Sequence, residues 1–281
     1  MKLSTDDIYK IKRRLLAYSP NLKQSWMMHI TILGFYLIAL LIVSLIGMLT
    51  GISAKLAPEW KDLTGHLLSV VIAVVIVIRL GKDSNYVPIV LPRQSLLLWL
   101  LLVPFVLSVS ITAELLTMWI PRPYMFINYM DYIDRQFQNN LPAFLSMLVA
   151  PVFSEWLSRG IVLKGLLTHY SPLKAIMWSS VIFGVLHAEP RMIVFAFFIG
   201  LAIGWIYWRT RSLCCCILMQ VTINMFTFLV KFYIPGKTTF ADLIGSYFIA
   251  VAIALFVCAL TVILIKKIVV SYDITSDMQS S

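Results

Sequence analysis

The sequence predicts an all-α membrane protein, a polytopic helical bundle of about eight transmembrane helices. Hydrophobic residues make up 60% of its 281 positions and charged residues 13%, and the mean hydropathy is +0.89. A water-soluble domain of this length could not bury so much apolar surface. The runs from Trp26 to Leu49 and from Phe240 to Ile265 are almost free of charge. Each holds the roughly 20 apolar residues needed to cross a ~30 Å hydrocarbon layer.

Eight apolar runs bounded by charged residues or proline are candidate spans. They lie near 27–50, 66–81, 96–120, 142–167, 172–188, 191–208, 213–233 and 240–265. The second and fifth are short, and a re-entrant or polar-lined helix would have the same pattern. The first run is longer than the ~7–15 apolar residues of a signal peptide, and no small-residue cleavage site follows it. We therefore expect it to be a retained span.

The lysines and arginines lie between the apolar runs, where they orient a protein in its membrane. With the N-terminus inside, sixteen of the 23 fall on the cytoplasmic side and seven on the other. This split predicts a multi-pass protein of the cell (inner or cytoplasmic) membrane with both termini in the cytoplasm. The net charge of +10 does not indicate nucleic acid binding, because the charges form no single basic face. Glu114 is expected to snorkel or to pair with Arg122.

The chain is expected to divide into three parts. Residues 1–25 form a basic cytoplasmic helix at the membrane interface, because apolar residues recur at helical spacing among basic ones. Residues 26–266 form the transmembrane bundle, and 267–281 form a flexible cytoplasmic tail. The stretch 121–140 is the largest expected connection outside the membrane, and membrane lipids are the expected surroundings.

The four cysteines, Cys214, Cys215, Cys216 and Cys258, lie in apolar stretches and suggest no disulfide framework. Consecutive positions on a helix diverge by about 100°, so the triplet cannot converge on one metal ion. No HExxH or similar spacing is present. We expect no metal and no cofactor. The cysteines are interpreted as small apolar packing residues, with lipidation near the membrane surface as the alternative.

Polar side chains inside predicted spans are costly and indicate function. Glu155 and Arg159 are four residues apart, as are Gln220 and Asn224, and His187 follows a phenylalanine at the same spacing. Each pair therefore shares one face of its helix. A rise of ~1.5 Å per residue places Glu155, His187 and Asn224 roughly 17–24 Å into the bilayer, so they are expected to share one polar cavity. The alternative is that these pairs only neutralise charge and join helices.

Three motifs occur in order at these positions: PVFSEWLSRG at 151–160, SSVIFGVLH at 179–187 and QVTIN at 220–224. With the linking segment at 204–213, residues 141–230 resemble the CAAX prenyl protease and bacteriocin-processing (Abi, CPBP) family of intramembrane proteases. The family's motifs are a double glutamate whose second member stands four residues before arginine, phenylalanine four residues before histidine, and histidine four residues before asparagine.

The resemblance implies a fold of eight spans and a membrane endopeptidase. It implies catalytic roles for Glu155, Arg159, His187 and Asn224. Two motif positions are substituted. Ser154 stands where the family has the glutamate that acts as general base, and Gln220 stands where it has a histidine.

Two hypotheses follow from this incomplete motif set. In the first, the protein is an endopeptidase in which Glu155 activates water, Arg159 positions that water, and His187 with Asn224 stabilises the oxyanion. Ser154 with His187 as nucleophile and base is a variant without a third orienting group. In the second, the protein is a pseudo-protease that binds a peptide or membrane partner without cleaving it. A transporter is disfavoured, because the sequence has no inverted repeat.

Overall fold

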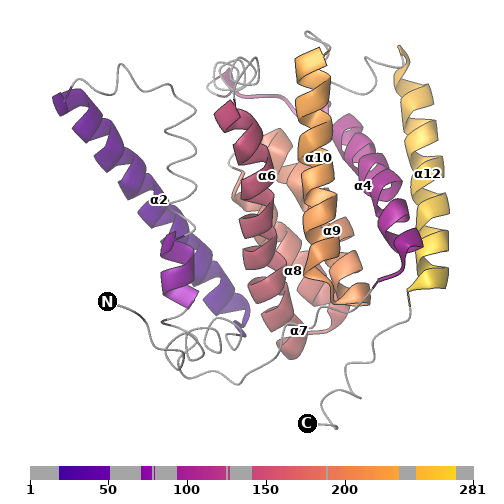
Figure 1. Ribbon diagram of the computed structural model, residues 1–281, viewed down its shortest axis with the longest axis horizontal. Helices are drawn as coiled ribbons and strands as arrows, with labels where there is room; N and C mark the ends of the chain where they lie inside the picture. The colour runs from indigo at the N-terminus through magenta and orange to yellow at the C-terminus, as the bar shows by residue number, and fades with distance from the viewer. Residues whose placement is uncertain are drawn as a thin grey trace. The chain divides into compact units, whose positions relative to one another are not determined.

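The computed structural model describes residues 19–50, 71–77, 79, 94–124, 126, 141–187, 189–233 and 245–269. All regular structure in this part of the chain is helical (Figure 1), which confirms the predicted all-α class. The chain forms two compact units, one of residues 1–89 with 130–171 and one of 90–129 with 172–281. The predicted interfacial helix before residue 19, most of the span 66–81, the connection after 126 and the tail after 269 lie outside the described residues.

The described part of the first unit contains two long helical segments. One is α2 (Leu22–Thr50), and the other is a continuous run of α6 (Leu141–Glu155), the π-helix η3 (Trp156–Leu163) and α7 (Lys164–His169). They correspond to the predicted spans 27–50 and 142–167. Residues 71–77, within the second predicted span, are also helical.

The start of α2 is fixed by a reciprocal cap. The Asn21 side-chain oxygen accepts from the Gln24 backbone N–H at 3.0 Å, and the Gln24 side-chain oxygen accepts from the Asn21 N–H at 2.9 Å. The segment before the helix lies against α7, where the hydroxyls of Ser19 and Thr168 are 3.0 Å apart. A Cβ on Gly165 would come within 2.6 Å of the Pro20 backbone, so this approach requires glycine.

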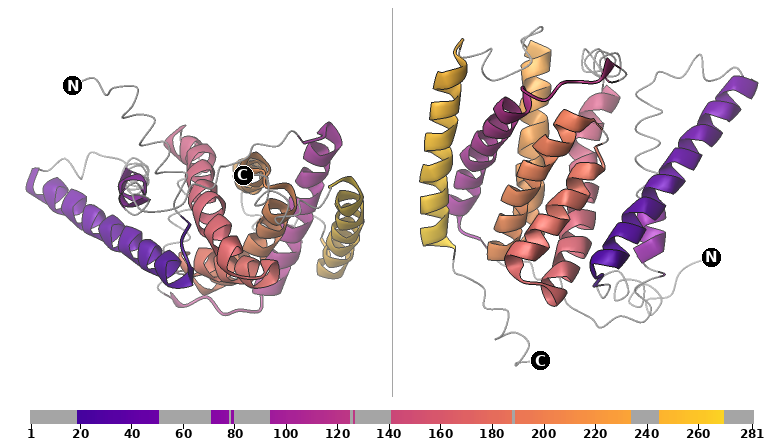
Figure 2. Two further views of the ribbon diagram at one scale, coloured as in Figure 1. Left: turned by 90° about the horizontal axis from the view of Figure 1, so that it is seen from below. Right: turned by 180° about the vertical axis from the view of Figure 1, so that it is seen from behind.

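The second unit contains five helices. They are α4 (Leu96–Thr117), α8 (Pro172–Val185), α9 (Pro190–Thr210), α10 (Leu213–Tyr233) and α12 (Tyr247–Ile268). Ser95 and Ser246 cap α4 and α12 by accepting backbone N–H groups with their hydroxyls. In the turn between α9 and α10, Arg211 adopts a left-handed conformation with φ 53°. Figure 2 shows α12 lying along α4, where Ile111 and Leu115 pack against Ala250 and Ala254.

Small residues bring α8 and α9 into close contact. A Cβ on Gly184 would lie 2.8 Å from the Ile193 carbonyl oxygen, and one on Gly200 would lie 2.9 Å from the Ser180 Cβ. Helices in a membrane associate through such close backbone approaches, because lipid provides no hydrophobic drive between them.

Four described helices are long and apolar enough to cross a membrane. They are Leu96–Thr117, Pro190–Thr210, the segment Leu213–Val230 of α10, and Tyr247–Ile268, and α8 is a shorter apolar helix. The structure therefore supports the predicted helical membrane bundle, while the number of eight spans stays a prediction.

Candidate functional site

Glu155 and Arg159 form a buried ion pair in the first unit. The Arg159 Nη1 donates to the Glu155 Oε1 at 2.6 Å, and the two side chains are 0% and 1% exposed. The four-residue spacing predicted this shared face. Glu155 Oε2 is also buried, and it has no hydrogen-bond partner among the described residues. A buried carboxylate oxygen without a partner is costly and requires an explanation.

The helix changes geometry at this pair. Glu155 is the last residue of α6, and the next eight residues, Trp156–Leu163, form the π-helix that contains Arg159. Pro151, one turn before Glu155, lies inside α6 and cannot donate the usual backbone hydrogen bond. π-Helical segments are rare and concentrate at functional sites. The apolar periodicity of the sequence contains no signal for this change.

Ser154, at the substituted motif position, precedes this pair. Its side chain is half-buried, and its hydroxyl donates to the Pro151 carbonyl oxygen at 3.2 Å. Such a bond to the preceding helical turn is common for serine in helices. The hydroxyl proton is therefore already engaged by the backbone.

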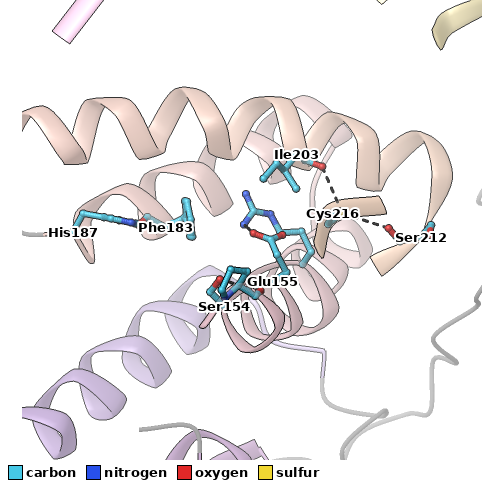
Figure 3. Close-up of polar contacts among 9 residues, drawn as sticks. Ser154, Glu155, Phe183, His187, Ile203, Ser212 and Cys216 are labelled. Carbon is cyan, nitrogen blue, oxygen red and sulfur yellow. Dashed lines mark hydrogen bonds and ion pairs between the residues drawn. The ribbon is translucent and has the colours of Figure 1, made fainter. Parts of the chain in front are cut away.

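His187 lies in the turn after α8, because α8 ends at Val185 rather than at the predicted 188. Its ring packs edge-on against Phe183 with centroids 5.1 Å apart (Figure 3), and its Nδ1 lies 3.0 Å from the Phe183 carbonyl oxygen. A carbonyl oxygen only accepts, so Nδ1 must carry a proton. In the neutral ring, Nε2 is then a hydrogen-bond acceptor and a base.

Gln220 and Asn224 are one turn apart on α10, and both are half-buried. The Gln220 side-chain oxygen has no hydrogen-bond partner within the described part of the chain. In the second unit α9 packs against both α8 and α10. The helices that carry the second and third motifs therefore share α9 as a neighbour.

Two of the three cysteines of α10 take part in packing. Cys215 and Cys216 are buried and Cys214 is exposed. The Cys216 thiol lies 3.4 Å from the Ser212 carbonyl oxygen and 3.9 Å from that of Ile203, which joins α10 to α9 (Figure 3). Among the described residues, no group of three or more histidine, cysteine or acidic side chains could hold a metal ion.

The six predicted site positions thus fall into two sets. Ser154, Glu155 and Arg159 belong to the first unit, and His187, Gln220 and Asn224 belong to the second. The ion pair joins two of them directly. The convergence of both sets on one cavity stays a prediction.

Sequence reasoning missed one buried acid next to His187. Glu189 pairs with Arg122, for which Glu114 was the suggested partner. The signal that could have found it is the pair Glu189–Pro190, because proline is favoured at the first position of a helix and the residue before it is the cap.

The fold and these residues define a helical membrane protein with polar groups embedded in apolar helices. Residues 136–226 match the family described as type II CAAX prenyl endopeptidase Rce1-like. This match confirms the resemblance predicted from the three motifs, all of which lie inside it, and it covers less than half of the chain. No curated protein and no solved structure matches the sequence.

Proposed function

We propose that this protein is a multi-pass endopeptidase of the CAAX protease type, acting on a peptide that enters the membrane. The observation that carries the proposal is the Glu155 carboxylate, which is buried with one oxygen on Arg159 and the other without a partner among the described residues. An oxygen in this state can accept a hydrogen bond from water. Arg159 fixes its orientation by a charge-assisted bond.

In the proposed reaction, the water bound at Glu155 Oε2 attacks the carbonyl carbon of the scissile peptide bond. Its proton passes to Glu155 or to the basic Nε2 of His187, and that proton later goes to the leaving amine as the C–N bond breaks. The Asn224 amide donates to the oxyanion of the tetrahedral intermediate. The Nδ1 contact of His187 favours this base role over the oxyanion role predicted above, because a neutral Nε2 cannot donate.

A binding function without hydrolysis is the second candidate. Ser154 supports it, because a serine hydroxyl that donates to its own helix replaces the family's base glutamate. Gln220 supports it as well, because an amide side chain cannot act as a base at the position of the motif histidine. In this case the protein would hold a peptide or a membrane partner without cleaving it.

Cleavage by purified protein in liposomes separates the two candidates. The probes are quenched fluorescent peptides that end in a cysteine, with and without a prenyl group. The endopeptidase proposal expects wild-type cleavage, a loss of ~10²–10⁴-fold in Glu155→Gln protein that is still folded, and little change in the neighbouring control Ser154→Ala. Peptide binding without cleavage, weakened in His187→Ala, would establish the binding function instead.

We also propose that both termini face the cytoplasm of the cell membrane. Two contacts in the second unit agree with the sides of the membrane assigned from the lysines and arginines, because each joins two segments that were assigned to the same side. Gln94 donates to the Thr210 carbonyl oxygen at one end, and Arg191 donates to that of Ile120 at the other. Labelling of single cysteines placed near Asp131 and Ser280 tests the topology. Opposite sides are expected, because five predicted spans separate the two positions, and labelling from the same side would contradict this odd number.

A further inference from the structure

Glu189 is a buried acid that holds two groups at the start of α9. Its Oε2 accepts the Met192 backbone N–H at 2.8 Å, and its Oε1 lies 3.4 Å from the Arg122 Nε. The Glu189 side chain is 3% exposed, while that of Arg122 is 31% exposed. Both carboxylate oxygens are therefore engaged, and the carboxylate cannot rotate without losing a partner.

The backbone of the same residue contacts His187. The Glu189 N–H donates to the His187 carbonyl oxygen at 2.6 Å, and the His187 N–H donates to the Gly184 carbonyl oxygen at 3.0 Å. The imidazole lies over Phe183, with its Nδ1 at the carbonyl oxygen of that residue. His187 is thus held from the α8 side by its ring and N–H, and from the α9 side through Glu189.

The segment after α4 is bonded to this turn by two side-chain contacts. Arg122 lies shortly after α4, and Arg191, two residues beyond Glu189, donates from its Nε to the Ile120 carbonyl oxygen at 2.6 Å. Arg122, from the segment after α4, therefore contacts the start of α9, and Arg191, from the start of α9, contacts the segment after α4. All of these residues belong to the second unit.

Helix capping alone does not account for a glutamate here. Asparagine, aspartate, serine and threonine are the favoured caps, because their short side chains reach the nearby N–H groups. The additional feature of Glu189 is its ion pair with Arg122 across 67 positions of sequence. The glutamate side chain, which is longer than those of the favoured caps, contacts both the Met192 N–H and the Arg122 guanidinium.

We propose that Glu189, through its ion pair with Arg122, is a positioning residue that keeps the His187 imidazole in the Nδ1–H form with a basic Nε2. This inference rests on the proposed function of His187, and it deepens that function by naming what orients the base. A group bonded to one ring nitrogen fixes the tautomer of a histidine in general, and here that group is the Phe183 carbonyl oxygen, while Glu189 acts on the ring only through the backbone of the turn.

Nitrogen NMR of the full-length protein in lipid nanodiscs, labelled with ¹⁵N-histidine, tests the proposal. His187→Gln assigns the His187 signals among those of the four histidines. In the wild type, Nδ1 should show a protonated and Nε2 an unprotonated shift. Glu189→Ser keeps a good cap and removes the carboxylate, so we expect it to convert His187 to a mixture of both tautomers.

Arg122→Gln removes the same ion pair from its partly exposed side, and it should have the same effect even if Glu189→Ser fails to fold. Arg209→Gln is the matched control, because this arginine donates to the Val269 carbonyl oxygen at the opposite end of α9. His187 shifts that stay at wild-type values in folded Arg122→Gln protein would overturn the proposal.

Kinetics separate this inference from the proposed function. If the wild type cleaves peptides, Arg122→Gln should lower kcat by at least ~10-fold with little change in KM, because an orienting contact acts in the transition state. A change in the His187 shifts without any cleavage by the wild type would support the positioning role and contradict the endopeptidase function.

Discussion

Removing one partner of the buried ion pair should strongly destabilise the protein. In Arg159→Met the replacement fills much of the arginine stem and removes the charge, which leaves the fully buried Glu155 without its cation. At the observed 2.6 Å, the Coulomb attraction is roughly 6 kcal/mol for an effective dielectric constant of about 20. After the cost of desolvation is considered, loss of one partner of such a pair typically reduces the free energy of unfolding by about 3–5 kcal/mol.

The double variant Glu155→Gln with Arg159→Met should recover more than half of this loss, because neither position then carries an unpaired buried charge. Unfolding by a denaturing detergent in mixed micelles, followed by tryptophan fluorescence, measures both free energies. Arg209→Met is a control for removal of an arginine at a helix end. A cost below about 1 kcal/mol for Arg159→Met would refute the reasoning, because it would mean that Arg159 reaches water or lipid headgroups.

The remaining predictions concern catalysis and helix packing. Ser154→Glu combined with Gln220→His restores the family motifs and should raise peptidase activity, measured with the peptide assay above; no increase in a folded double variant would contradict the role assigned to these positions. Gly184→Ala should lower the free energy of unfolding by about 1–3 kcal/mol, because its Cβ would meet the Ile193 carbonyl oxygen at 2.8 Å. Gly34→Ala is the matched control, since a Cβ there has nothing within 4 Å, and equal losses in both variants would refute the packing argument.

The helical architecture could be predicted because a membrane sets the length and composition of its helices. The run 213–233 corresponds to α10, and the run 96–120 begins where Ser95 caps α4. The start of α2 at Leu22 lies before the predicted 27, because the cap formed by Asn21 and Gln24 extends the helix beyond its apolar part. A hydropathy profile locates only the apolar part of a helix, so it misses a polar first turn such as this one.

The candidate site could be predicted in part. The spacing of Glu155 and Arg159 predicted one shared face, and the structure confirms a direct ion pair. The π-helix could not be predicted, because eight apolar-rich residues do not distinguish its period from that of an α-helix. The pair of Arg122 and Glu189 could not be predicted either, because a contact between residues so distant in sequence depends on how α4 packs beside α9.

Cross-linking between the first and third motifs tests whether both motif sets border one cavity. Cysteines replace Ser154 and Gln220 in a protein whose native cysteines are changed to serine or alanine, and a short bifunctional thiol reagent is added in native membranes. We expect an efficient cross-link between these two positions, and a peptide that binds the site should block it. A pair of cysteines replacing Ser19 and Thr168, whose hydroxyls lie 3.0 Å apart, provides the positive control. Efficient cross-linking of the control pair without any cross-link between positions 154 and 220 would contradict the convergence of the two motif sets.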